Sequence, residues 1–124
     1  MVGFIIHPKR HLQKLINQGE YIEAIEYAKS IETKFESDSD FWFIFGGVYF
    51  ILDDAKKALP YFEKSLALKD DDVETLIIKT NAHLFLEQKD EAIQCCKRII
   101  QIEPDNYEAH GLLEKLEFFD KFNK

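Results

Sequence analysis

Apolar residues recur along the chain with a helical spacing, and short polar segments interrupt this pattern at regular intervals. The interruptions lie at residues 18–20, 53–54 and 87–90, and each separates two apolar stretches of helical length. Each pair of stretches therefore indicates a helix, a short turn and a second helix. In full, the pattern predicts seven helices, over residues 8–18, 21–36, 39–52, 54–68, 72–86, 89–102 and 106–121.

Residue types at the predicted helix ends fit these assignments. Pro8 suits the first turn of a helix, where a backbone N–H has no helical acceptor, and Pro104 follows a helix that it cannot extend. Acidic side chains favour helix N-termini because unpaired N–H groups lie there. The expected N-terminal caps are Asp54, Asp71 with Glu74, and Asp105 with Glu108.

The chain also repeats itself at a fixed interval. Ala24, Ala58 and Ala92 are evenly spaced in the sequence. Two further columns have the same spacing: Ile16, Phe50, Leu84 and Phe118, and Asn17, Ile51, Phe85 and Phe119. A repeat of about this length is typical of stacked helical hairpins, because one hairpin alone cannot bury its apolar face.

The middle unit carries a motif, Trp42-x2-Phe45-Gly46-x2-Tyr49, followed by Ala58-x3-Phe62. This motif resembles the tetratricopeptide repeat, whose signature is W-x2-L-G-x2-Y and then A-x3-F within one repeat. The next unit resembles a divergent copy, with Ala92-x3-Cys96 and a closing Pro104. The first unit keeps only a few of the signature positions: Leu15, Ala24 and Ala28.

The resemblance implies an all-α fold, a right-handed α-α superhelix of three helical hairpins and a C-terminal capping helix. We expect one structural domain overall, with an apolar N-terminal extension over residues 1–7. The hairpins are predicted over residues 8–38, 39–72 and 73–106, and the capping helix over 107–124. Small residues such as Gly46 allow the two helices of a hairpin to approach, and large ones such as Trp42, Tyr49 and Phe62 fill the space between hairpins.

Composition narrows the class of protein. A net charge of −7 and a pI near 5.1 argue against nucleic-acid binding, which requires clustered Lys and Arg. The two cysteines, Cys95 and Cys96, are adjacent on a predicted helix and form no disulfide framework, which favours a reducing, cytoplasmic location. The uncharged stretch 41–52 is too short to span a membrane, and Met1–Ile6 is too short for a signal-peptide core.

Few residues suggest chemistry. His7 and His11 are four apart on one helix, but no further ligand follows at a metal-binding spacing. His83 occupies a packing position and is interpreted as a hydrogen-bonded core residue, and residues 70–72 lack the rest of a calcium loop. Lys97 and Arg98 beside Cys95 leave a reactive thiol as an open alternative. We predict no catalytic residues, no enzyme activity, no metal site and no cofactor.

The resemblance implies a ligand surface on the first helix of each hairpin, which lines the concave groove of tetratricopeptide proteins. Helix 39–52 is apolar almost all round, so we expect solvent-facing aromatics in the columns of Phe41, Phe43 and Phe50. The predicted partner-binding groove comprises Lys9, Gln13, Phe43, Phe50, Ile51, Ile77, Asn81, Leu84, Phe85, Phe118 and Phe119.

These features predict a protein-interaction scaffold that binds an apolar helix or extended peptide with basic flanks. A co-chaperone clamp for acidic chaperone tails is excluded, because its remaining basic and amide slots fall on Ile44, Glu74 and Ile78. Two alternatives stay open. The exposed aromatics, including Phe118 and Phe119, are also compatible with self-association, and Met1–Ile6 or the 118–119 pair is compatible with closure of the groove by the chain itself.

Overall fold

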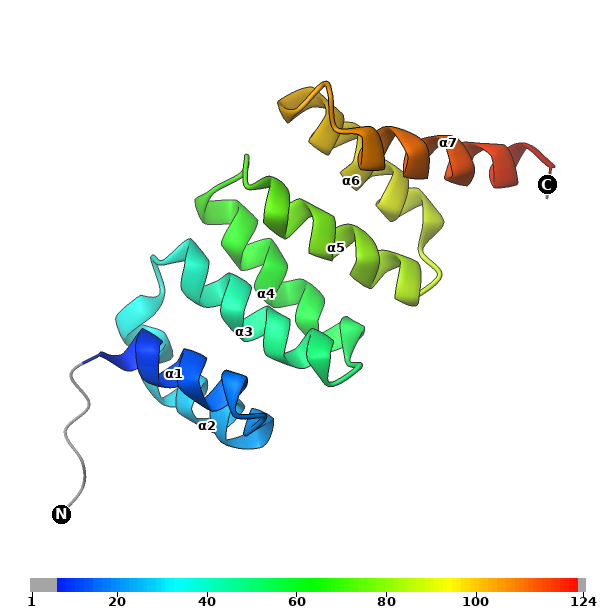
Figure 1. Cartoon of the computed structure of the whole chain (residues 1–124). Helices are drawn as coiled ribbons and strands as arrows, with labels where there is room; N and C mark the ends of the chain where they lie inside the picture. The colour runs from blue at the N-terminus through cyan, green and yellow to red at the C-terminus, as the bar shows by residue number, and fades with distance from the viewer. Residues whose placement is uncertain (1–6, 123–124) are drawn as a thin grey trace, which may run out of the picture. The chain divides into compact units, whose positions relative to one another are not determined.

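The computed structural model describes residues 7–122, with the side chains of Phe119, Asp120 and Phe122 left out. These residues form α-helices and one 3₁₀ helix, η1, with no strand among them (Figure 1). The helices are α1 (Pro8–Asn17), α2 (Tyr21–Ile31), η1 (Glu32–Phe35), α3 (Ser39–Ile51), α4 (Ala55–Leu68), α5 (Val73–Phe85), α6 (Lys89–Ile102) and α7 (Tyr107–Phe122).

The predicted helices are confirmed, and nearly every end agrees with the prediction to within one residue. The exception is the second helix, predicted over residues 21–36. There α2 ends at Ile31 and the chain continues as the tighter η1. Of the predicted extension over residues 1–7, residues 1–6 lie outside the described residues.

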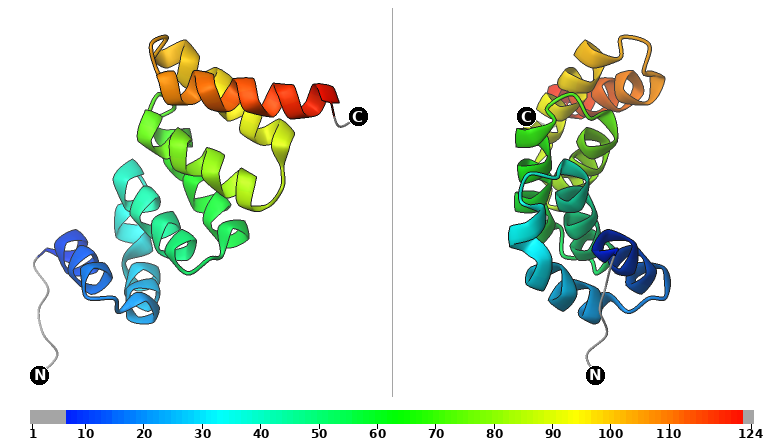
Figure 2. Two further views of the ribbon diagram at one scale, coloured as in Figure 1. Left: turned by 45° about the vertical axis from the view of Figure 1, so that its right-hand side comes forward. Right: turned by 90° about the vertical axis from the view of Figure 1, so that its left-hand side faces the viewer.

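The chain divides into two compact units: unit 1, Met1–Leu68, and unit 2, Lys69–Lys124. In unit 1, α1 packs on α2 and α3 packs along α4, while α1 and α2 also contact α3. In unit 2, α5 packs on α6, which in turn contacts α7. The α3–α4 pair and the α5–α6 pair are both visible as antiparallel hairpins (Figure 2).

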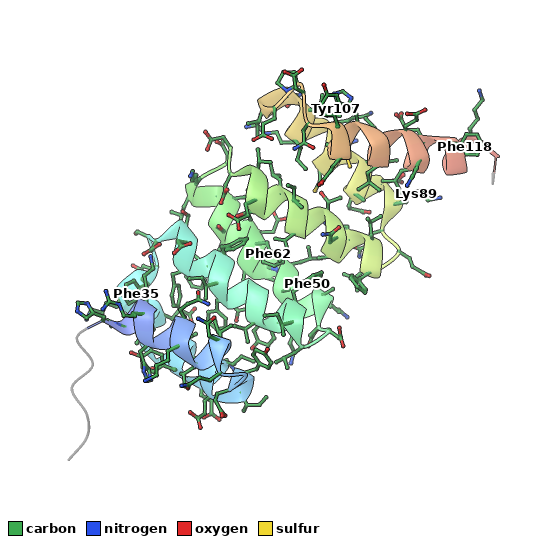
Figure 3. All side chains as sticks on the ribbon, viewed as in Figure 1. Phe35, Phe50, Phe62, Lys89, Tyr107 and Phe118 are labelled. Atoms are coloured by element: carbon green, nitrogen blue, oxygen red, sulfur yellow. The ribbon has the colours of Figure 1, made fainter. Side chains whose placement is uncertain are left out.

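The α3–α4 hairpin closes around Gly46. A methyl group added at its Cα would lie 2.7 Å from Cε1 of Phe62, well inside van der Waals contact. Phe62 is fully buried and points from α4 toward α3 (Figure 3). The predicted role of Gly46, to let the two helices approach, is therefore confirmed.

Aromatic rings from α3, α4 and η1 form much of the remaining core of unit 1. The Tyr61 ring from α4 stacks on Phe45 with centroids 4.2 Å apart and on Tyr49 at 5.5 Å. Phe41, which was expected to be among the solvent-facing columns, is fully buried, and this expectation is wrong. The reason is η1, whose Phe35 stacks on the Phe41 ring with centroids 5.5 Å apart.

Unit 2 has its own core, centred on Ala92, Ile93, Cys96 and Leu116. His83 is buried and its Nδ1 lies 2.8 Å from the Gln88 Oε1, as expected of a hydrogen-bonded core histidine. Both cysteines are buried thiols. Burial raises the pKa of the Cys96 thiol to about 11, so this group stays protonated at neutral pH.

The caps lie partly where they were predicted. Asp54 accepts a hydrogen bond from the Lys57 N–H at 3.1 Å, as expected. At the other two helices the N-cap position lies one residue beyond the predicted one, and the Asp72 side chain accepts from the Thr75 hydroxyl and not from a backbone N–H. Asp72, not Asp71, precedes α5, and Asn106, not Asp105, accepts from the Ala109 N–H at 2.9 Å.

Each hairpin turns through a residue with positive φ at the same place in the repeat. Gly19 (φ 77°), Asp53 (φ 61°) and Glu87 (φ 57°) occupy equivalent positions in the three successive hairpins. In each case the N–H of the following residue bonds to the carbonyl five residues earlier, for example Asp54 to Tyr49 at 2.9 Å. This is the Schellman ending of a helix, in which a left-handed residue, usually Gly, closes the last turn.

An ion pair connects α1 to the start of α3. The Lys9 Nζ lies 2.9 Å from the Asp38 Oδ2 and 3.2 Å from the Asp40 Oδ2. Asp38 also caps α3 by accepting from the Phe41 N–H at 3.2 Å. Burial alone would raise the Asp38 pKa, but hydrogen bonds from Lys9 and Phe41 outweigh it, so the pKa is lowered. The hydrogen bond with Asp38 is the main cause of a raised Lys9 pKa.

We predict that Gly46→Ala destabilises the protein by about 1–3 kcal/mol, because the added methyl overlaps the buried Phe62 ring. The matched control is Gly47→Ala, whose Cβ would have no atom within 4 Å. This neighbour should gain about 0.5–1 kcal/mol from the better helix former. Urea unfolding of both variants measures the difference, and equal effects would contradict the close approach.

We also predict that Lys9→Met lowers the free energy of unfolding by about 0.5–1 kcal/mol at pH 7, as for a solvent-screened pair. The lowered Asp38 pKa stabilises the fold above the ordinary carboxyl value, about 3.9, and this contribution is lost as the pH falls through the folded pKa. The raised Lys9 pKa keeps its contribution up to about 10.4, beyond which it is lost as the pH rises through the folded pKa.

The difference between wild type and Lys9→Met should therefore be constant from about pH 5 to 10 and vanish in acid. Thermal unfolding from pH 2 to pH 10 checks the profile. Arg10→Met, at the exposed neighbouring position in α1, is the control and should show no such acid dependence. A Lys9→Met difference that persists at pH 2 would show that the ion pair is not its source.

Candidate partner-binding faces

In unit 1, three of the predicted groove residues lie on one face of α3. Phe43, Phe50 and Ile51 are spaced i, i+7 and i+8, which places them along one side of a helix. Phe43 is half-buried and its ring lies 6.3 Å from that of Phe62. Phe50 is half-buried as well, and Ile51 is 50% exposed. The face is therefore apolar, with its accessible part at the C-terminal end of α3.

The two predicted residues of α1 are engaged with neighbouring side chains. Lys9 is held by the two carboxylates at the start of α3, so its ammonium is neutralised within unit 1. Gln13 is exposed and donates from Nε2 to the Asn17 Oδ1 at 3.0 Å. Sequence reasoning did not anticipate the partners of Lys9, because Asp38 is 29 residues away in the chain.

In unit 2, the corresponding face of α5 is more open. Ile77 is 38% exposed, Phe85 is 72% exposed, and Asn81 lies between them on the same side of the helix. Leu84 differs from the other predicted groove residues of α5, because it is half-buried and packs against the core of unit 2.

A cavity of about 130 Å³ separates this face of α5 from α7. Ile77 and Asn81 line it from α5, and Glu108 and Leu112 line it from α7. The buried Cys96 forms part of its interior. The cavity thus combines apolar side chains with the amides of Asn81 and Asn106, the Thr80 hydroxyl and the Glu108 carboxylate, a composition that is typical of ligand pockets.

Helix α7 has exposed aromatics toward both of its ends. Tyr107 is 84% exposed and Phe118 is 60% exposed (Figure 3). The side chain of Phe119 lies outside the described ones. Sequence reasoning missed Tyr107 as a surface residue, and it also missed Ile22 on α2, which is 65% exposed. Neither residue occupies a signature position of the repeat, so the sequence offered no signal to distinguish these apolar residues from core residues.

The residues considered for chemistry are dispersed or buried. The His11 ring packs edge-on against Tyr27 with centroids 4.7 Å apart. Within residues 7–122, and leaving aside the side chains not described, no three His, Cys, Asp or Glu residues gather in a metal-binding group. Cys95 is 5% exposed. In the same part of the chain no helix has the length and apolar character needed to cross a bilayer.

Solved structures with the same fold cover most of this chain. The first tetratricopeptide domain of Spaghetti (RPAP3), bound to the HSP90 peptide SRMEEVD, is 24% identical, with a TM-score of 0.78 over 89% of this chain and 87% of that one. The second such domain of human RPAP3, in complex with the HSP70 peptide SGPTIEEVD, is 20% identical, with a TM-score of 0.78 over 90% and 93%.

A third similar structure is the Yersinia enterocolitica type III secretion chaperone SycD, in complex with a peptide of the translocator YopD. It is 11% identical, with a TM-score of 0.82 over 91% of this chain and 92% of that one. At these identities the likeness concerns the fold, and it confirms the predicted class, an all-α solenoid of helical hairpins. A search of curated proteins found no significant match.

The model of one protein family, described as the tetratricopeptide repeat, matches residues 49–116, more than half of the sequence. The match begins at Tyr49 in α3 and extends into α7, so it includes the whole α5–α6 hairpin, whose signature diverges more than that of the α3–α4 hairpin. On this evidence the chain belongs to the tetratricopeptide repeat family.

Proposed function

We propose that this protein is a non-enzymatic adaptor that binds an apolar helix or extended segment of another protein. The proposal rests on one repeat position that is exposed to solvent in both the α3–α4 hairpin and the α5–α6 hairpin. Ile51 in α3 and Phe85 in α5 occupy the same position of successive repeats, and they are 50% and 72% exposed. Large apolar side chains that stay exposed at equivalent positions mark a binding surface rather than a core.

The proposed contact residues are those of the α3 and α5 faces, with a contribution from α7. Phe43 and Phe50 supply apolar area on α3, while Asn81 offers an amide that can hydrogen-bond the backbone of an extended segment. Phe118 and Phe119 remain proposed members on α7.

The cavity of unit 2 fits one apolar side chain of the partner. Its volume of about 130 Å³ is close to the roughly 150 Å³ of an engineered apolar cavity that holds benzene. Glu108 on the cavity wall would pair with a basic residue that flanks the bound side chain. This arrangement supports a partner that is apolar with basic flanks.

The similar structures support peptide binding as the general activity, since three of them contain a bound peptide. The acidic tails bound by two of them are not the ligand that we propose. Two positions that would need basic or amide side chains to hold an acidic tail carry Ile44 and the exposed Glu74. Lys9, at a third such position, is already paired with two carboxylates. Two buried thiols are consistent with the reducing cytoplasm as the site of action.

The decisive variant is the double substitution Ile51→Glu and Phe85→Glu. Peptides are first selected from a random displayed library on the wild-type protein, and their affinities are then measured by calorimetry. We expect the double variant to bind at least tenfold more weakly, because two charges would be desolvated against an apolar ligand. Ile22→Glu is the control, since Ile22 is equally exposed but lies outside the proposed faces. Unchanged affinity in the double variant would exclude these faces.

The second candidate function is self-association through α7. It is favoured by the exposure of Tyr107 and Phe118 and by a surface hollow of about 470 Å³ along this helix, lined by Leu113 and Phe118 among others. If it holds, light scattering should show a mass that rises with concentration, and Phe118→Glu should return the protein to a monomer. A wild-type monomer at millimolar concentration would exclude it.

A further inference from the structure

A third depression, in unit 1, shares no residue with the proposed binding faces. It has a volume of about 520 Å³ and lies between the end of α2 with η1 and the last turns of α4. Glu32 and Glu36 line one side, and Lys64 and Leu68 line the other. Trp42 also belongs to the lining and is only 4% exposed.

The chain places one of its own cations in this cleft. The Lys64 Nζ lies 4.4 Å from the centre of the Trp42 ring and 5.7 Å from that of Tyr61. It also lies 4.0 Å from the Glu32 Oε1, at the outer limit of an ion pair. The ring face of tryptophan is the strongest aromatic partner of a cation. The cleft is therefore suited to positive charge.

Lys64 is held only loosely in this position. Its side chain is 51% exposed and that of Glu32 is 39% exposed, so solvent screens their attraction. Another cation that offered better geometry would replace the Lys64 ammonium without disturbing the core. The flexible lysine stem can move into solvent, since Lys64 lies on the exposed side of α4.

The Trp42 ring, in contrast, is fixed. Its Nε1–H donates to the Glu36 carbonyl oxygen at 2.9 Å, and the ring stacks on Tyr61 with centroids 6.0 Å apart. The indole donor is thus already used and offers nothing to an anion. A ring held in place before binding loses little freedom when a ligand arrives.

We propose that this cleft binds the guanidinium group of an arginine side chain from a partner protein, and that Lys64 takes its place in the free chain. Arginine fits better than lysine because its planar group stacks on an aromatic face and reaches a carboxylate with two N–H groups. Glu32 and Glu36 supply the carboxylates, and Leu68, 47% exposed, covers the aliphatic stem. Lys29, which also lines the cleft, repels an arginine side chain, whereas the net charge of −7 of the whole chain attracts it.

The test uses the full chain and the indole N–H resonance of Trp42, which is unambiguous because the sequence has one tryptophan. The probe is the blocked tripeptide Gly-Arg-Gly, added at millimolar concentrations. Its control replaces arginine by citrulline, which has nearly the same shape and no charge. We expect a saturable shift with the arginine peptide and little shift with the citrulline peptide.

Lys64→Ala should bind the arginine peptide roughly two- to fivefold more tightly, because the internal competitor is gone. Glu32→Gln should bind it more weakly. Lys57→Ala is the matched control on the same helix, since Lys57 lies over Tyr49 at 5.9 Å and outside the cleft, and its affinity should equal that of wild type.

Equal shifts with the arginine and citrulline peptides in both wild type and Lys64→Ala would overturn the proposal. So would a larger shift with Gly-Glu-Gly, which would indicate an anion site. These results do not depend on the α3 and α5 faces, so a failure here leaves the proposed function standing, and the reverse also holds.

Discussion

The contact between Gly46 and Phe62 determines how closely α3 and α4 pack. With hydrogen in place of a side chain on α3, the Phe62 ring of α4 occupies space that any Cβ would take, and the helices come near enough for the Tyr61 ring to stack on Phe45. That stack in turn holds Trp42, whose indole N–H is paired with the Glu36 carbonyl. The position of the Trp42 ring, which lines the cleft of unit 1, therefore depends on this approach.

Most of the fold follows from the sequence because its causes are local or periodic. Ala24, Ala58 and Ala92 were identified by their spacing alone, and all three are completely buried. The helix ends agree because polar breaks and prolines act within a few residues of their own positions. In unit 2 the repeat places Thr80 at the position of Gly46. The Thr80 side chain is buried, and its hydroxyl donates to the Leu76 carbonyl oxygen at 2.7 Å.

The errors concern contacts between residues that are distant in the chain or details of turn geometry. Phe41 is buried because η1 presents Phe35 to it, and nothing in the hydrophobic pattern distinguishes a 3₁₀ turn from the end of a helix. The caps at Asp72 and Asn106 were displaced by one residue, since several acceptors precede each helix and backbone angles select among them. The ion pair of Lys9 could not be anticipated, because charge alone does not name its partner.

The candidate faces were predictable only as far as the repeat determines them. The register of the repeat placed Ile51 and Phe85 correctly in one column, but their exposure depends on what packs nearby, which the sequence does not specify. Likewise, Trp42 was expected to fill space between hairpins. The contact between the Trp42 ring and Lys64 from α4 is known only when the helices are in place.

The left-handed residues at the three hairpin turns have a further consequence. Gly19 adopts its φ without cost, whereas the side chain of Glu87 makes this conformation unfavourable by about 1–2 kcal/mol, and that of Asp53 makes it unfavourable by less, because aspartate tolerates the left-handed region better. The packed helices on either side must hold these two residues in place. This backbone strain lowers the free energy of local opening at the loops after α3 and α5. Transient fraying of a hairpin should therefore begin at these two loops rather than at the loop after α1.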